Sequence, residues 1–125
     1  MGRVRTIVPD SRRLELSDGD WMVVKRRLTA GERKSVTQSL MLRTAADGTR
    51  SHDYLSFTFD SVLVYVLEWS LSDSKGKTLP ITRATLENLD EADFDELEKA
   101  VDAHEAEMKQ EIAEAKKAHG ETTAA

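Results

Sequence analysis

The chain has 125 residues and a mass of 14.0 kDa, a length at which one hydrophobic core buries most of the surface that the unfolded chain exposes. Hydrophobic residues at 39% and charged residues at 33% are typical of a soluble domain, not of a disordered or membrane chain. The absence of cysteine excludes disulfides, thiolate metal ligands and cysteine nucleophiles. No apolar run is long enough for a membrane span or a signal sequence, so we expect a cytoplasmic protein with no membrane partner.

Charge is unevenly distributed along the sequence. Residues 1–50 carry 11 Lys/Arg and 6 Asp/Glu, a net charge of +5, whereas residues 51–125 carry 7 and 17, a net charge of −10. Such asymmetry either steers a charged partner or lets the two halves attract one another, within the fold or between protomers. We favour mutual attraction of the halves.

The first predicted element is a β-hairpin around Asp18-Gly19, because this dipeptide supplies the positive φ values of a type I′ turn. A two-residue turn would pair Leu16 with Trp21. One face would then carry Leu14, Leu16, Trp21 and Val23. The other face, open to solvent or a partner, would carry Arg13, Glu15, Met22 and Val24.

Thr29-Ala30-Gly31-Glu32 has the pattern of a capping box and predicts the start of a helix. Its inner face would carry Val36, Leu40 and Leu42 or Arg43. The turn residues Ala46-Asp47-Gly48 would end the helix, and Thr49–Asp53 would form a polar loop.

The segment Leu55–Leu71 has both strand-like and helix-like periodicity. Its length without Gly or Pro favours one central helix, with Trp69 in the core. The following SLSDSKGKTLPIT predicts a turn at Gly76 and a short extended arm or hairpin strand at Leu79 and Ile81.

A helical turn over Thr85–Leu89 and a long helix capped by Asp90 are predicted next, with Gly120 ending the helix after about Ala118. His104 interrupts the apolar stripe of this helix and is predicted to lie at the surface. The narrow stripe suits a seam with a partner better than a core. Its residues are Phe94, Leu97, Val101, Met108, Ile112 and Ala115.

The predicted fold class is α+β, mainly α, with an N-terminal β-hairpin packed on a small helical domain and a long C-terminal helix. Residues 1–89 would form the hairpin and helical core. Residues 90–119 would form the acidic C-terminal helix of the same domain, and residues 120–125 a disordered tail. The candidate partner-binding residues are Trp21, Met22, Val24, Leu97, Val101, Met108 and Ile112.

No pattern predicts catalysis. His104-Glu105 begins like a zinc-protease helix, but position 108 is Met, so the second ligand is missing. Asp90, Asp93 and Asp95 lack the calcium-loop pattern and are explained as an acidic helix start. Gly-rich phosphate loops and nucleophile elbows are absent from the sequence. We therefore expect no enzyme, no cofactor and no metal.

A basic patch near Trp21 offers a different interpretation, a small DNA-binding regulator. Its cations would be Arg12, Arg13, Lys25, Arg26, Arg27, Arg33 and Lys34. The acidic remainder and the pI of about 5.2 disfavour nucleic acid as a partner.

Three stretches, RLELSDGDWMVVKRRLTAGE, YVLEWSLSDSKGKTLPIT and LDEADFDELEKAVDAHE, together resemble small proteins from the tail gene clusters of long-tailed bacteriophages, most of all tail assembly chaperones. The resemblance covers most of residues 12–107. It rests on scaffold residues, not chemical ones: Trp21, Trp69, Ser70, Leu71, Asp73, Gly76, Lys77 and Pro80.

The resemblance implies a non-catalytic factor in the host cytoplasm that escorts the tape measure protein and recruits tail tube subunits. Homo-oligomerisation is a further expectation, because opposite charges at the two ends of the chain could bring copies together. The alternative is a structural virion protein, such as a minor tail or connector subunit.

Overall fold

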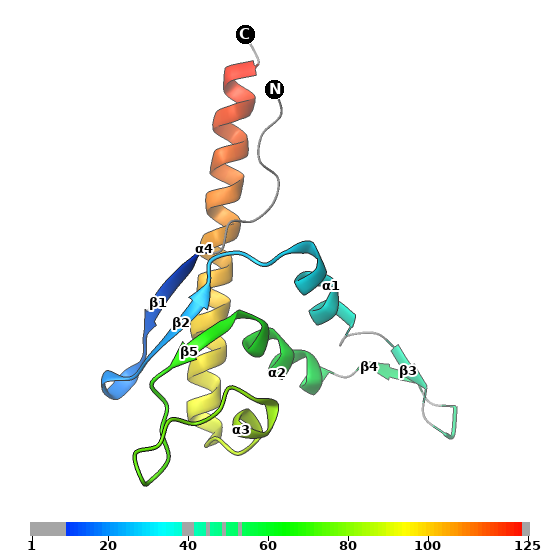
Figure 1. Cartoon of the computed structure of the whole chain (residues 1–125). Coiled ribbons are helices and arrows are strands. Elements are labelled where there is room, and N and C mark those ends of the chain that lie inside the picture. Colours follow the sequence, from blue (N-terminus) through cyan, green and yellow to red (C-terminus); the bar gives the residue numbers. More distant parts are fainter. Residues whose placement is uncertain (1–9, 39–41, 45, 49, 53, 124–125) are drawn as a thin grey trace.

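The computed structural model of the chain describes residues 10–38, 42–44, 46–48, 50–52 and 54–123. Within them lie five strands and four α-helices, an α+β arrangement that is mainly α, as predicted (Figure 1). The strands are β1 (Ser11–Glu15), β2 (Trp21–Lys25), β3 (Leu42–Thr44), β4 (Arg50–His52) and β5 (Val66–Trp69). The helices are α1 (Ala30–Gln38), α2 (Tyr54–Tyr65), α3 (Arg83–Glu87) and α4 (Glu91–Thr123).

The main sheet is antiparallel and has the strand order β1-β2-β5. One of its faces packs on α4, which crosses behind the sheet in Figure 1, while α2 and α3 close the core at the side. Strands β3 and β4 form a separate antiparallel pair beyond the ends of α1 and α2.

The predicted hairpin is present, but its register differs by one residue. Asp18 and Gly19 have the expected positive φ values of 57° and 79°. However, Glu15 pairs with Trp21, so five residues connect the strands, with a 3₁₀ turn at Ser17–Gly19. A one-residue shift moves every side chain of a strand to the opposite face. Met22 and Val24 therefore enter the core, and Trp21 and Val23 face outward.

Helix α1 begins with the predicted capping box. Thr29 Oγ1 accepts a hydrogen bond from Glu32 N at 3.1 Å, and Glu32 Oε1 accepts one from Thr29 N at 2.9 Å. The helix ends at Gln38, earlier than predicted, and Leu42 and Arg43 lie in strand β3. The expected polar loop contains strand β4, and Leu40 lies outside the described residues. The turn residues 46–48 therefore connect two strands.

The single central helix predicted over Leu55–Leu71 is wrong in its second part. The chain leaves helix α2 at Tyr65 and enters strand β5 at Val66 directly. Strand β2 explains the switch, because pairing with Met22 and Val24 satisfies backbone groups of both strands and buries Val66 and Trp69. Trp69 is in the core as predicted, and its Nε1 donates to Leu79 O at 2.8 Å.

The turn after β5 forms where predicted. Gly76 has a φ of +80°, and Asp73 Oδ1 accepts hydrogen bonds from the backbone N of Lys75 and Lys77. Leu79 N donates to Leu71 O at 2.8 Å, so the arm folds back as a small hairpin. The chain then makes α3 before α4.

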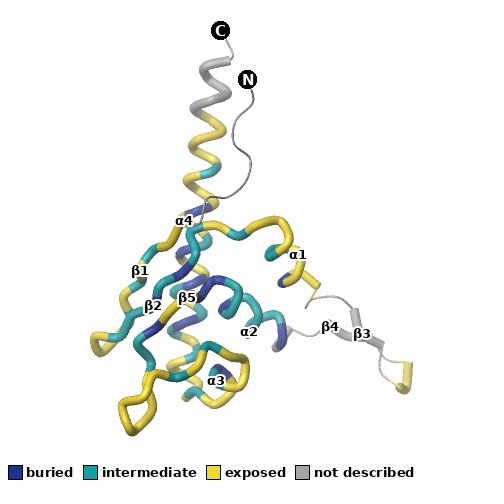
Figure 2. The backbone as a smooth tube through the Cα atoms, in the orientation of Figure 1, coloured by how far each residue is buried: buried dark blue, intermediate teal, exposed yellow. Residues whose placement is uncertain are grey.

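Helix α4 starts after Asp90, whose Oδ1 accepts a hydrogen bond from Ala92 N at 2.9 Å. It continues through Gly120 to Thr123, so the predicted stop at Gly120 is wrong. One glycine weakens a helix by about 1 kcal/mol but does not force its end. The C-terminal part of α4 extends beyond the sheet and is largely exposed up to residue 117 (Figure 2).

The basic and acidic halves of the chain meet along α4, as the charge distribution indicated. Arg12 pairs with Glu107, Arg26 with Glu111 and Arg33 with Glu105. These contacts tie β1, the end of β2 and α1 to the last helix. Each pair is partly exposed, so each contributes little alone.

Candidate functional site

Five of the seven predicted partner-binding residues lie inside the protein's own core. Their side chains are 0–6% exposed: Met22, Val24, Leu97, Val101 and Met108. The prediction that these five residues contact a partner is therefore wrong. The hairpin register turns the two strand residues inward, and the stripe of α4 packs against the sheet and α2 instead of a second chain. Ile112 is half-buried further along α4.

Trp21 lies on the sheet face opposite α4, which we call the outer face. Its ring is half-buried, and the guanidinium Cζ of Arg13 lies 4.7 Å from the ring centroid. Val23 is half-buried beside it, and Leu67 of β5 is 45% exposed. No described helix covers this face (Figure 1). Leu67 was not among the predicted partner-binding residues, because Leu55–Leu71 was predicted to form one helix, whereas Leu67 lies in strand β5.

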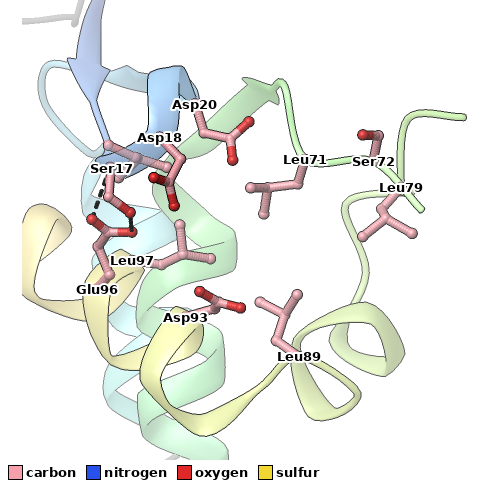
Figure 3. Close-up of a pocket in the computed structure, with 11 residues that line it drawn as sticks. Ser17, Asp18, Asp20, Leu71, Ser72, Leu79, Leu89, Asp93, Glu96 and Leu97 are labelled. Carbon is pink, nitrogen blue, oxygen red and sulfur yellow. Dashed lines mark hydrogen bonds between the residues drawn. The ribbon is translucent and has the colours of Figure 1, made fainter. Parts of the chain in front are cut away.

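A hollow of about 190 Å³ opens at the turn end of the hairpin, and we call it the leucine cleft (Figure 3). The β1–β2 turn, the loop after β5 and the first turns of α4 form its walls. Apolar lining comes from Leu16, Leu71, Leu79, Leu89 and Leu97, and polar lining from Ser17, Asp18, Asp20, Ser72, Asp93 and Glu96.

The four carboxylates of the cleft have different surroundings. Glu96 accepts hydrogen bonds from Ser17 N and Ser17 Oγ, both at 2.9 Å, which holds the hairpin turn against α4. Asp20 accepts one from Ser70 Oγ at 2.8 Å. In Figure 3 the carboxylates of Asp18, Asp20 and Asp93 point towards the space bordered by the leucines. Among the described residues, no Lys or Arg forms an ion pair with any of the four.

His104 is buried, with 1% of its surface exposed, so the prediction of a surface histidine is wrong. Its Nε2 lies 2.9 Å from Lys25 O at the end of β2. Because a carbonyl oxygen only accepts, Nε2 carries the proton in this contact. The ring stands edge-on to Tyr65, with centroids 5.8 Å apart, and Nδ1 has no partner among the described residues. His104 thus fixes α4 to β2 and α2.

A charged network surrounds Tyr65 next to this histidine. The Tyr65 hydroxyl accepts from Arg33 at 3.1 Å and donates to Glu105 at 3.2 Å. Burial would raise the pKa of Glu105, but Lys109, Arg33 and the Tyr65 hydroxyl together hold it below its usual value. Burial and the charge of Glu105 raise the pKa of Asp102. The network stabilises the contact of α1, α2 and α4, and it opens onto no described pocket.

The described residues contain no cluster of three or more His, Asp or Glu side chains that could hold a metal ion. Within the same part of the chain, none of the helices is both long and apolar enough to cross a membrane. No protein family, curated protein or solved structure gives a significant match to the chain.

Proposed function

We propose that the protein is a non-catalytic protein-binding factor that contacts its partner through the outer face of the sheet. The observation that carries this proposal is the position of Trp21, Val23 and Leu67 on a face that no described helix covers. Trp21 and Val23 are half-buried there, and Leu67 is 45% exposed. Aromatic side chains with an apolar surround and a polar rim are typical of binding hot spots.

The chemistry of this face suits a protein surface better than a small molecule. The outer face of the sheet provides contact area without an enclosed volume, and the charged residues Arg13, Glu15 and Glu68 border its apolar centre. Arg13 already stacks on Trp21, so the ring is held in place before a partner arrives. Such preorganisation lowers the entropic cost of binding.

The resemblance of the sequence to tail assembly chaperones suggests which partner the outer face binds. The partner would be the tape measure protein, with recruitment of tail tube subunits as the consequence. Assembly factors of this kind need adhesive surfaces and no catalytic group, in agreement with the proposed outer-face contact.

The DNA-binding alternative receives less support from the arrangement of charges. Five of its seven cations already pair with carboxylates of the same chain: Arg12, Arg13, Lys25, Arg26 and Arg33. Phosphate would have to displace these carboxylates. An acidic helix beside most of the pairs repels a polyanion as well.

Co-purification from cells that produce the complete set of tail genes tests the proposal. A tagged wild-type chain should retain the tape measure protein, identified by mass. Trp21→Ala should weaken binding by about 30-fold or more, the loss typical of a hot-spot residue of about 2 kcal/mol. The matched control is Arg27→Ala, which truncates an exposed side chain outside the face.

Equal retention by Trp21→Ala and wild type, with both variants folded by circular dichroism, would contradict an outer-face contact. Retention of nucleic acid alone, lost steeply with salt and weakened by Arg27→Ala, would support the DNA-binding alternative instead.

A further inference from the structure

We propose that the leucine cleft binds residues 2–8 of a second copy of this chain, so that copies associate head to tail. This inference concerns a different surface from the outer face and goes beyond the proposed partner binding.

The cleft has room and lining for an aliphatic side chain. Five leucines line a hollow of about 190 Å³, larger than the roughly 150 Å³ apolar cavity that accepts benzene in another protein. Of these leucines only Leu97 is fully buried, whereas Leu16, Leu71, Leu79 and Leu89 are partly buried at the edge of the core. Filling the cleft with an aliphatic group would remove this apolar surface from water.

The charge of the cleft favours a cationic occupant. Three carboxylates further along α4, those of Glu105, Glu107 and Glu111, pair with arginines. At the cleft, Asp18, Asp20, Asp93 and Glu96 have no Lys or Arg partner among the described residues. An occupant with both aliphatic and cationic side chains would satisfy the two features together.

The chain contains one segment of this chemistry outside the described residues. Residues 2–8 read GRVRTIV and contain two arginines, Arg3 and Arg5, three aliphatic residues, Val4, Ile7 and Val8, and no acidic residue. In an extended conformation alternate side chains point to the same side, so Arg3, Arg5 and Ile7 can face the cleft together. The isoleucine would then contact the leucines, and the guanidinium groups would contact the carboxylates that point into the same space.

The direction of β1 favours the cleft of a second copy over the cleft of the same chain. Strand β1 begins at Ser11, whereas the cleft residues Ser17, Asp18 and Asp20 lie at the other end of the hairpin. To reach its own cleft, the segment before Asp10 would have to reverse and run back along the whole strand. A second copy meets the segment without this reversal. The contact is heterologous and leaves one cleft and one segment free at the ends.

Two charge variants of the full chain test the proposal. Arg3→Glu/Arg5→Glu reverses the segment and leaves the cleft intact. Asp18→Asn/Asp93→Lys removes most of the cleft charge and leaves the segment intact; Asn tolerates the positive φ of Asp18. The matched control, Arg27→Glu/Lys34→Glu, reverses two cations for which the described structure shows no ion pair.

Sedimentation velocity at about 50 mM and about 500 mM salt reports the association. Wild type and control should form a concentration-dependent series of oligomers that weakens with salt. Each charge variant alone should associate at least about tenfold more weakly. An equimolar mixture of the two variants should form a dimer and stop there, because it contains one intact segment and one intact cleft.

A wild-type chain that stays monomeric at all concentrations would overturn the proposal. Association that persists in both variants would overturn it too, because another surface would be responsible. Capture of the tape measure protein should not change in either variant, and Trp21→Ala should not change self-association. Failure of self-association through the leucine cleft can thereby be distinguished from failure of partner binding through the outer face.

Discussion

Two adjacent valines of strand β2 provide a direct test of the hairpin register. Val24 is 0% exposed and faces the core, whereas Val23 is half-buried on the outer face. Substitution of either by alanine removes the same two methyl groups from the same strand. The change in intrinsic strand propensity is therefore nearly equal at the two positions, and the difference between the variants reports burial.

The expected losses in the free energy of unfolding follow from the different burial of the two valines. Two buried carbon groups at about 0.8 kcal/mol each give about 1.6 kcal/mol for Val24→Ala, and the cavity left in the core raises this to about 2–3 kcal/mol. Val23→Ala leaves no enclosed cavity and should cost about 0.5–1 kcal/mol. The free energy of unfolding should thus differ by at least about 1 kcal/mol between the two variants.

Urea denaturation followed by circular dichroism measures both values, with the slope of the transition as a check that both variants unfold as wild type does. A two-residue turn at Asp18-Gly19 would put Val23 in the core and Val24 outside. A larger loss for Val23→Ala than for Val24→Ala would therefore refute the five-residue connection and the burial of Met22 that depends on it.

Two further predictions concern the cap of α1 and the charges near Tyr65. Thr29→Ala should lower the free energy of unfolding by about 1 kcal/mol in urea denaturation, and Thr29→Ser, which keeps the hydroxyl, should restore most of it. The lowered pKa of Glu105 means that its ionised form stabilises the fold above the unfolded pKa near 4.5, and that this stability is lost as pH falls through the lower folded pKa. The raised pKa of Asp102 has the opposite sign, because its ionised form costs stability at neutral pH and acid relieves the cost. Glu105→Gln should therefore lower the urea midpoint at pH 7, and Asp102→Asn should raise it. Both differences from wild type should shrink below about pH 4. A lower midpoint for both variants at pH 7 would contradict the opposite signs of the two pKa shifts.

Local sequence signals were sufficient where the structure depends on near neighbours. The capping box at Thr29, the cap at Asp90 and the turn at Gly76 all form as predicted. Each is decided by hydrogen bonds within a few residues. The charge distribution also indicated the pairing of the two halves, although not its partners.

The sequence around His104 does contain a signal for its burial. Leu97, Val101, His104 and Met108 follow one another at intervals of four, three and four residues, which places them on one face of a helix. The polar character of histidine suggested an interruption of that face. Its hydrogen bond to Lys25 O, 79 residues away, makes burial tolerable, and no local pattern predicts such a contact.

The leucine cleft was also beyond prediction from local patterns. Asp18 and Asp20 belong to a recognisable turn, and Asp93 and Glu96 to a recognisable helix start. Nothing in the spacing of these residues indicates that turn and helix meet. Their proximity depends on packing between segments that lie more than 70 residues apart.

The sequence alone determined the mixed fold class, the starts of α1 and α4, the position of the hairpin and the attraction between its basic and acidic halves. Only the tertiary structure decided the hairpin register, the change from α2 to β5 and the burial of the apolar stripe of α4. The physical reason is that β2 needs partners on both edges and an apolar layer beneath one face. Residues distant in sequence meet those requirements. Their contacts decide the structure wherever the hydrophobic periodicity fits both a helix and a strand.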